Sequence, residues 1–232
     1  MRAHPEPQEL MRARVRAARP APRLEDAWGD PAWAQAETLE LAHFRPEGSD
    51  HRPRTQARLL HTPDGLCGIF RVEDRYVRSV HEHFGEPVYE DSCVEIFLLP
   101  RPGRGYLNFE MNCGGTLHAC HITDHRRVPG GFAAFTPLRE EEGRRVLVRS
   151  SQPRTLDPEV AGPLAWQLAF FIPTALVERY VGELGPLPGQ AWRANLYKCG
   201  DKTSHPHWAS WAPLQARNFH LPECFGTLHF EA

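Results

Sequence analysis

Short apolar or alternating segments, separated by turn-forming residues, run through most of this chain. The 22 prolines and 18 glycines among 232 residues favour many turns over long helices. Helical patterns of 10–15 residues between the apolar segments are missing, which argues against a parallel α/β fold. The pattern therefore predicts an all-β protein, built as an antiparallel β-sandwich with one or two short helices.

The expected strands are the segments with β-type alternation or a short apolar run. They span residues 39–44, 57–61, 66–73, 93–99, 106–113, 117–122, 145–148, 164–172, 192–199 and 226–230. One helix is expected over 174–181, because Pro173 and Thr174 start it and Gly182 follows its last residue. A second, short helical turn is expected within 76–84.

The chain divides into a short arm and one domain. Residues 1–22 are rich in Arg, Pro and Ala, so we expect an N-terminal arm that is flexible or helical. Residues 23–232 contain no repeat and no low-complexity linker, and they are expected to form a single domain.

Composition excludes several functional classes. The 27 basic and 29 acidic side chains give a net charge of −2, which does not suggest a nucleic-acid-binding protein. The sequence contains no run of 18 apolar residues that would predict a membrane helix. No secretory signal is recognisable at its start, so a cytoplasmic location is expected. The six cysteines form no Cys-x-x-Cys pair and are expected to be reduced thiols.

Three strands show a polar face that ordinary solvated sheets rarely carry. The period of two places one set of apolar side chains on each strand toward the core. These are Val94, Ile96 and Leu98; Leu107, Phe109, Met111 and Cys113; and Trp192, Ala194 and Leu196. The opposite faces include Glu95, Asn108, Glu110, Asn112, Asn195 and Tyr197. Asn is disfavoured in strands, so its recurrence indicates a function.

This chemistry suits a sugar. Planar amides and carboxylates make directed hydrogen bonds to vicinal hydroxyl groups. Tyr89 precedes the first polar strand and Phe219 lies in a loop before the last strand, so both rings are candidates to stack on the C–H face of a pyranose. We therefore expect a saccharide-binding surface formed by these side chains, although periodicity alone does not show that the three strands are neighbours.

At this point the sequence resembles the family 9 carbohydrate-binding modules and their DOMON-like relatives. The most specific segment is residues 89–97, Tyr-Glu-Asp-Ser-Cys-Val-Glu-Ile-Phe. Further segments that carry the likeness are 26–28 with 31–33, 106–113, 195–201 with 210–213, and 219–226. The resemblance covers roughly residues 22–231.

The resemblance implies a β-sandwich of DOMON-like or jelly-roll type that binds a saccharide without being an enzyme. It places Tyr89 and Phe219 where the family has two sandwiching Trp residues, and Glu95 and Asn112 where a carboxylate and an amide contact hydroxyls. Glu110 and Tyr197 stand where the family has Arg and Gln, which is a departure. It also implies structural calcium, a glycoside hydrolase partner and a role in carbohydrate catabolism.

Two other functions remain open from the residues. Glu95 and Glu110 on one face are the type of pair that a glycoside hydrolase uses. Haem or metal binding, as in some DOMON relatives, is suggested by closely spaced histidines at 81 and 83, at 118, 121 and 125, and at 205 and 207. Asp74, Asp91 and Asp201 are calcium candidates that could equally cap turns. Oligomeric state is not indicated.

Overall fold

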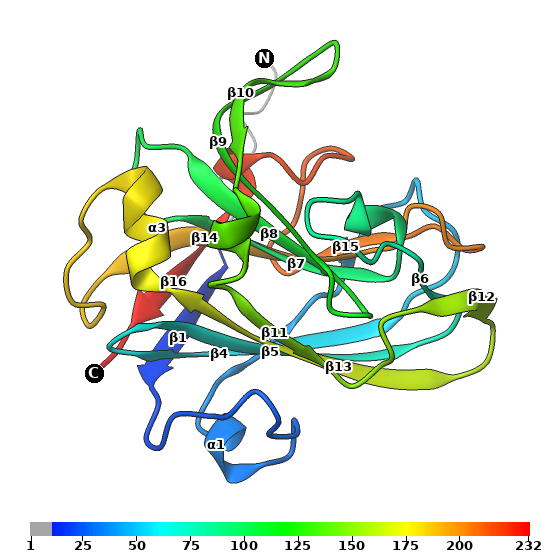
Figure 1. Ribbon diagram of the computed structural model, residues 1–232, viewed down its shortest axis with the longest axis horizontal. Helices are drawn as coiled ribbons and strands as arrows, with labels where there is room; N and C mark the ends of the chain where they lie inside the picture. Colours follow the sequence, from blue (N-terminus) through cyan, green and yellow to red (C-terminus); the bar gives the residue numbers. More distant parts are fainter. Residues whose placement is uncertain (1–10) are drawn as a thin grey trace, which may run out of the picture.

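The computed structural model describes residues 11–232, which form two layers of strands packed face to face (Figure 1). The upper sheet has the order β10 (Gly131–Pro137), β9 (Leu117–Val128), β8 (Tyr106–Asn112), β7 (Cys93–Leu99), β14 (Ala191–Cys199) and β16 (Gly226–Phe230). β15 (Trp208–Ser210) pairs with β14, and β3 (His43–Phe44) pairs with β15. This architecture confirms the predicted β-sandwich.

The lower sheet has the order β4 (Arg54–Thr62), β5 (Gly65–Asp74), β13 (Leu164–Pro173) and β11 (Leu147–Ser150), with β2 (Thr38–Glu40) beside β4. A separate ribbon pairs β6 (Val77–Ser79) with β12 (Leu156–Val160). The helical segments are short: α1 (Pro31–Ala34), α2 (Glu140–Gly143), α3 (Thr174–Val181), and the 3₁₀ turns η1 (Val88–Glu90) and η2 (Pro222–Cys224). None of the described helices could cross a lipid bilayer.

Some of the predicted helices and strands are confirmed by the structure and others are wrong. α3 has the predicted bounds, because the sequence carries both its start and its stop. The short helical turn expected within 76–84 is wrong, since Val77–Ser79 pair as strand β6. The segment 39–44 is not one strand: its two ends form β2 and β3, which belong to different sheets.

The core lies between the two sheets and confirms the alternation predicted for β7, β8 and β14. Val94, Ile96 and Leu98 of β7 belong to one buried cluster. The inward side chains of β8 and β14, and Phe70, Trp166 and Phe170 of the lower sheet, belong to the same cluster. The second face of each strand is therefore turned away from this core.

Strand β1 (Arg12–Ala17) joins the two layers. Its first part pairs in parallel with β16, and its last two residues pair in parallel with β4 of the lower sheet. The expectation of a flexible or helical arm is therefore wrong for this segment, because Ala13 and Val15 are buried while the alternating arginines of the strand face solvent. Residues 1–10 of the expected arm lie outside the described part.

Buried charges connect the sheets at one end. Lys198 on β14 and Asp74 at the end of β5 have fully buried side chains, with 3.4 Å between the ammonium and a carboxylate oxygen. His51 Nε2 lies 2.7 Å from the other carboxylate oxygen, and His207 Nε2 lies 2.7 Å from Lys198 Nζ. Such pairing is what makes buried charge tolerable.

The same neighbours control protonation. Burial and the Lys198 ammonium lower the pKa of His207 to about 3, so its ring is neutral and accepts a hydrogen bond from Lys198. Burial disfavours the charged form of Asp74, but Lys198 and the hydrogen bond from His51 outweigh it and hold the pKa of Asp74 below its usual range. Both shifts make the folded state bind fewer protons than the unfolded chain in acid.

We predict that Val15→Ala lowers the free energy of unfolding by about 2 kcal/mol, because it leaves a void where β1 joins the layers. Val15 has no exposed surface, whereas Arg12 on the same strand is exposed. Arg12→Ala should therefore change stability by less than about 0.5 kcal/mol. Chemical denaturation measures both variants, and equal effects would contradict the structural role assigned to β1.

We also predict that acid destabilises the fold through His207. As the pH falls from about 6.5 toward about 3, the unfolded chain gains a proton at His207 that the folded chain does not hold. The free energy of unfolding should decline by up to about 1.4 kcal/mol per pH unit from this group. Urea denaturation at several pH values should show a shallower decline for His207→Gln than for exposed His43→Gln; identical slopes would refute the assignment.

Candidate functional site

The three polar strands are neighbours. β7 lies between β8 and β14 in the upper sheet. In the antiparallel register Glu95 is opposite Glu110 on one side and opposite Tyr197 on the other. One row of polar side chains therefore crosses the outer face of the sheet, on the side away from the core.

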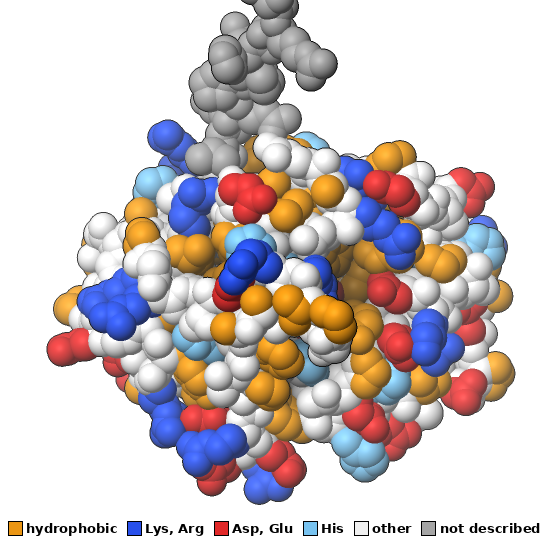
Figure 2. All heavy atoms as spheres, turned by 90° about the horizontal axis from the view of Figure 1, so that it is seen from above, with side chains coloured by type: hydrophobic (Ala, Val, Ile, Leu, Met, Phe, Trp, Pro, Cys, Tyr) orange, Lys and Arg blue, Asp and Glu red, His pale blue; other side chains and the backbone are white. Residues whose placement is uncertain are grey.

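A pocket of about 430 Å³, here called the central pocket, lies over this row. The β9–β10 hairpin, which rises above the upper sheet in Figure 1, forms one wall. The loop that contains residues 217–220 forms another, and Phe132 on the hairpin lies 4.4 Å, between ring centroids, from His220 in this loop. Figure 2 looks onto this side, where apolar and acidic side chains surround a hollow.

The central pocket brings together five of the eight predicted site residues. Tyr89, Glu95, Asn108, Glu110 and Phe219 line it. Glu95, Asn108 and Glu110 form its floor and are nearly inaccessible to solvent, whereas Tyr89 at the rim is 40% exposed. Their role as ligand-binding residues remains a prediction, now with a common location.

The other three predicted residues, Asn112, Asn195 and Tyr197, are buried and do not line the pocket. Asn195 Nδ2 donates to the Ala212 carbonyl, and its Oδ1 accepts from the Ala212 amide at 2.8 Å. Tyr197 donates its hydroxyl to the Phe219 carbonyl, and its ring stacks on that of Phe219 with centroids 4.1 Å apart. Both side chains hold loops in place.

Asn112 is likewise occupied by the protein. Its Nδ2 donates to the His81 carbonyl at 2.8 Å and to an Asp91 oxygen at 2.9 Å. Its Oδ1 accepts from the Thr116 amide at 2.9 Å. These bonds use both N–H donors and one acceptor position of the Asn112 amide, so the side chain is satisfied without a ligand.

The pocket floor concentrates acidic groups in a poorly solvated place. Burial raises the pKa of Glu95 well above its ordinary value, and neighbouring Cys199 and Glu110 add to the shift. Burial also raises the pKa of Glu110, which outweighs the opposing influence of His118. Two neighbouring carboxyls in a poorly solvated place resist ionising together, so the floor presents oxygens that accept hydrogen bonds and, on a protonated carboxyl, an O–H group that donates one.

One oxygen on the floor has no partner. Asn108 Nδ2 donates to Glu110 Oε1 at 2.5 Å, and Cys199 donates its thiol hydrogen to Glu95 Oε1 at 3.1 Å. Glu110 Oε2 is buried and, within residues 11–232, has no hydrogen-bond partner. Buried polar atoms are normally satisfied, so this oxygen marks a place for a donor from a bound molecule.

Several lining residues were not found by sequence reasoning. Trp208 donates its indole N–H to Asp201 at 2.6 Å and carries the Arg217 guanidinium 3.8 Å above its ring. Arg127 on the hairpin lies 4.1 Å above the Phe132 ring. These groups come from irregular or unpredicted segments, where alternation gives no signal.

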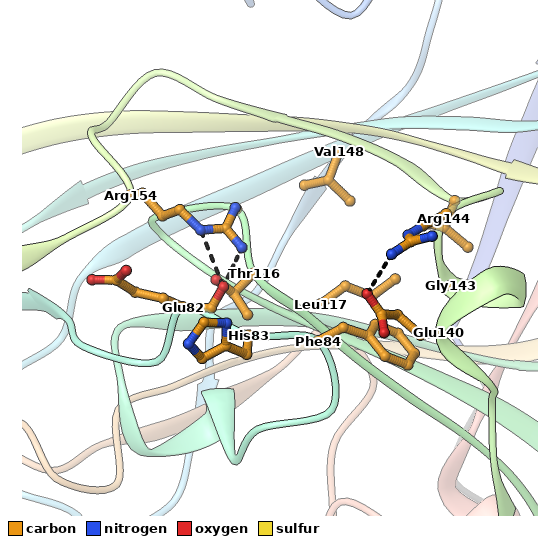
Figure 3. Close-up of a pocket in the computed structure, with 12 residues that line it drawn as sticks. Glu82, His83, Phe84, Thr116, Leu117, Glu140, Gly143, Arg144, Val148 and Arg154 are labelled. Atoms are coloured by element: carbon orange, nitrogen blue, oxygen red, sulfur yellow. Dashed lines mark hydrogen bonds and ion pairs between the residues drawn. The ribbon is translucent and has the colours of Figure 1, made fainter.

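A second pocket, also of about 430 Å³, lies apart from this face (Figure 3). Its charged groups already bind one another: Arg144 pairs with Glu140 at 2.8 Å, and Arg154 donates to the Glu82 carbonyl at 3.1 Å. Among the lining residues within the described chain, Thr116 has a buried hydroxyl oxygen, Oγ1, that has no hydrogen-bond partner. The unpartnered atom of the central pocket differs in kind, because it belongs to a carboxyl group that lies beside a second carboxyl, that of Glu95.

The three calcium candidates form no common site in residues 11–232, and most of their carboxylate oxygens are engaged by the protein, so calcium binding stays a prediction. The Asp74 carboxylate is held by Lys198 and His51. Asp91 binds the Arg78 guanidinium and the Asn112 amide, and Asp201 accepts from Trp208. Oxygen ligands engaged by cations and N–H donors are not free for a calcium ion.

The predicted histidine clusters do not assemble either. His81 binds Glu90, and His207 binds Lys198. His118 Nδ1 contacts the Gly85 carbonyl, and His121 Nε2 contacts the Arg104 carbonyl. In the described chain, the side chains whose ligand atoms lie close enough together to bind one metal ion are those of two cysteines and a glutamate, and no histidine is among them.

Comparisons with known proteins identify the family and the fold. The sequence matches the profile of carbohydrate-binding family 9 over residues 32–230. A crystal structure of a Bacteroides uniformis protein, assigned provisionally to carbohydrate binding, is 28% identical with a TM-score of 0.80 and covers 96% of this chain and 100% of its own. No curated protein matches the sequence.

Two further structures share the fold. Both are a family 9 carbohydrate-binding module from Caldicellulosiruptor kristjanssonii, one in complex with glucose and one with cellotriose. Each is 12% identical with a TM-score of 0.64 and covers 96% of this chain; this chain covers 96% of the glucose complex and 94% of the cellotriose complex.

We predict that Asn112→Ala lowers the free energy of unfolding by about 2–4 kcal/mol, because it leaves buried partners unsatisfied. Asn218→Ala is the matched control, since this amide lies in the partly exposed loop at the pocket wall. Urea denaturation should separate the two variants clearly. A stable Asn112→Ala protein would show that the hydrogen bonds of Asn112 are dispensable.

Proposed function

Because this chain belongs to carbohydrate-binding family 9, we propose that its central pocket binds a saccharide without transforming it. The single observation that carries the proposal is the pocket floor, where Glu95 and Glu110 lie side by side and Glu110 Oε2 has no partner in residues 11–232. A sugar hydroxyl can donate to that oxygen and accept from a protonated neighbour.

The rings of the pocket support the same ligand. Tyr89 is exposed at the rim, and Phe219 is held in the wall by stacking on buried Tyr197. Trp208 lines the pocket as well. Aromatic faces beside polar groups suit a pyranose, which has apolar C–H faces and an edge of hydroxyl groups. The glucose and cellotriose complexes of the structural neighbours make these two sugars the first ligands to test.

Glycoside hydrolysis is less well supported. Hydrolases assign opposite protonation states to their two carboxyls, one acid and one ionised base or nucleophile, through environments that separate the pKa values. Here burial raises the pKa of both Glu95 and Glu110. The family is one of binding modules. A hydrolase partner and a role in carbohydrate catabolism stay predictions from the sequence resemblance.

Isothermal titration calorimetry with glucose, cellotriose and a panel of other mono- and oligosaccharides tests the proposal. We expect at least one sugar to bind with a Kd in the range of about 1 μM to 1 mM, because a small, partly solvated pocket makes few contacts. Glu110→Gln should weaken binding by about 10-fold or more, since it removes an acceptor that nothing else supplies. Tyr89→Ala should cost about 10-fold through lost stacking.

Glu140→Gln is the matched control, because Glu140 is exposed and lines the second pocket. It should leave the saccharide Kd unchanged. The proposal is rejected if the folded protein binds no saccharide, or if Glu140→Gln weakens binding as much as Glu110→Gln.

A further inference from the structure

Two thiols and a carboxyl converge at the floor of the central pocket. Cys93 on β7 and Cys199 on β14 are opposite each other in the strand pairing, and Glu95 lies two residues along the same face of β7. One ligand atom from each of the three residues lies within 4.8 Å of the others. All three side chains are almost completely buried.

We propose that Cys93, Glu95 and Cys199 bind one soft divalent metal ion of the zinc class. In a tetrahedral zinc site with bonds of about 2.3 Å to sulfur and about 2.0 Å to oxygen, neighbouring ligand atoms are about 3.5–3.8 Å apart. All three observed ligand atoms lie within 4.8 Å of one another, and Cys199 Sγ and Glu95 Oε1 are 3.1 Å apart, so small side-chain adjustments would bring them to this spacing around one ion. Two thiolates with one carboxylate favour such an ion over calcium or magnesium.

A second observation also points to a missing cation or donor. Glu110, the partner of Glu95 across the strands, has a buried oxygen without a partner in residues 11–232. Asp201 lines the same pocket and already accepts a hydrogen bond from Trp208, so the donor is missing at Glu110. The nearest ammonium on β14, that of Lys198, is bound to His207 and Asp74 instead. A metal ion would supply the positive charge, and it lowers the energy of a bound thiolate.

The three ligands leave a coordination position open to the pocket. Glu95 and Cys199 line the pocket, whereas Cys93 does not. An ion can therefore enter from the pocket, and its fourth position faces the place where a ligand would sit. Water or a hydroxyl can fill that position, as in zinc sites with three protein ligands.

If the proposed function is also correct, metal and saccharide share Glu95. Zn²⁺ should then change the saccharide Kd, and the change should vanish in Cys93→Ser. Cys93 does not line the pocket, so this substitution tests the metal without removing a contact to the sugar. Saccharide binding is also measured with a chelator present. A sugar that binds without metal supports the proposed function even if the metal proposal fails, and metal binding without any sugar does the reverse.

The direct test is a titration of the reduced, metal-free full chain with Co²⁺, a spectroscopic substitute for Zn²⁺. We expect thiolate-to-cobalt charge-transfer absorption that saturates at one ion per chain and disappears when Zn²⁺ is added. Cys93→Ser, Cys199→Ser and Glu95→Gln should each weaken binding by at least about 100-fold, because each removes a direct ligand.

Cys120→Ser is the matched control, since Cys120 also lines the pocket but its thiol lies beside His118 and outside the cluster. It should retain the absorption. Circular dichroism checks that each variant is folded. In the unmodified chain, which needs no variant to fold, Zn²⁺ should protect two cysteines from alkylation, identified by mass spectrometry as Cys93 and Cys199.

The proposal is overturned if the reduced chain gives no thiolate absorption, or if the absorption persists when Cys93 and Cys199 are both replaced. It is equally overturned if Zn²⁺ protects other cysteines and leaves these two reactive.

Discussion

The period of two along β7, β8 and β14 governs both the core and the pocket. Each strand must bury one face against the lower sheet, which commits Val94, Phe109 and Leu196 to the core. The opposite faces then lie together, because the three strands are hydrogen-bonded neighbours. A slip of one residue in any pairing would turn polar side chains of one strand, such as Glu95 or Asn195, into the core. Stability and the position of Glu95 beside Glu110 therefore have the same cause.

The walls of the central pocket change the protonation of the polar side chains on its floor. The β9–β10 hairpin and the loop around Phe219 restrict water, so the carboxyls hold protons more tightly than they would in solution. The loop is positioned by Tyr197, which bonds to its backbone and stacks on its ring. A pocket that combines poor solvation, acidic groups and an oxygen without a partner suits either hydroxyl groups that donate hydrogen bonds or a metal ion that the oxygens and thiolates coordinate.

Sequence reasoning found the elements whose signals are local. Pro173 and Gly182 delimit α3, and alternation identified Glu95, Asn108 and Glu110 on one face. It missed β1, because parallel pairing to two sheets depends on distant strands. It also could not show that Asn112 and Asn195 satisfy neighbouring backbone or carboxylate groups, since an amide suits a ligand and a loop equally well. The pocket residues Arg127, Asp201 and Trp208 come together only through long-range contacts.

We propose above all that a sugar binds at the floor of the central pocket, beside Glu95, Asn108 and Glu110. A crystal structure of the chain soaked with glucose or cellotriose tests it most directly. We predict a pyranose in the central pocket, with a hydroxyl within hydrogen-bond distance of Glu110 Oε2 and a ring face against Tyr89 or Phe219. A sugar bound instead in the second pocket beside Arg144 and Glu82, with the central pocket containing only water, would contradict it.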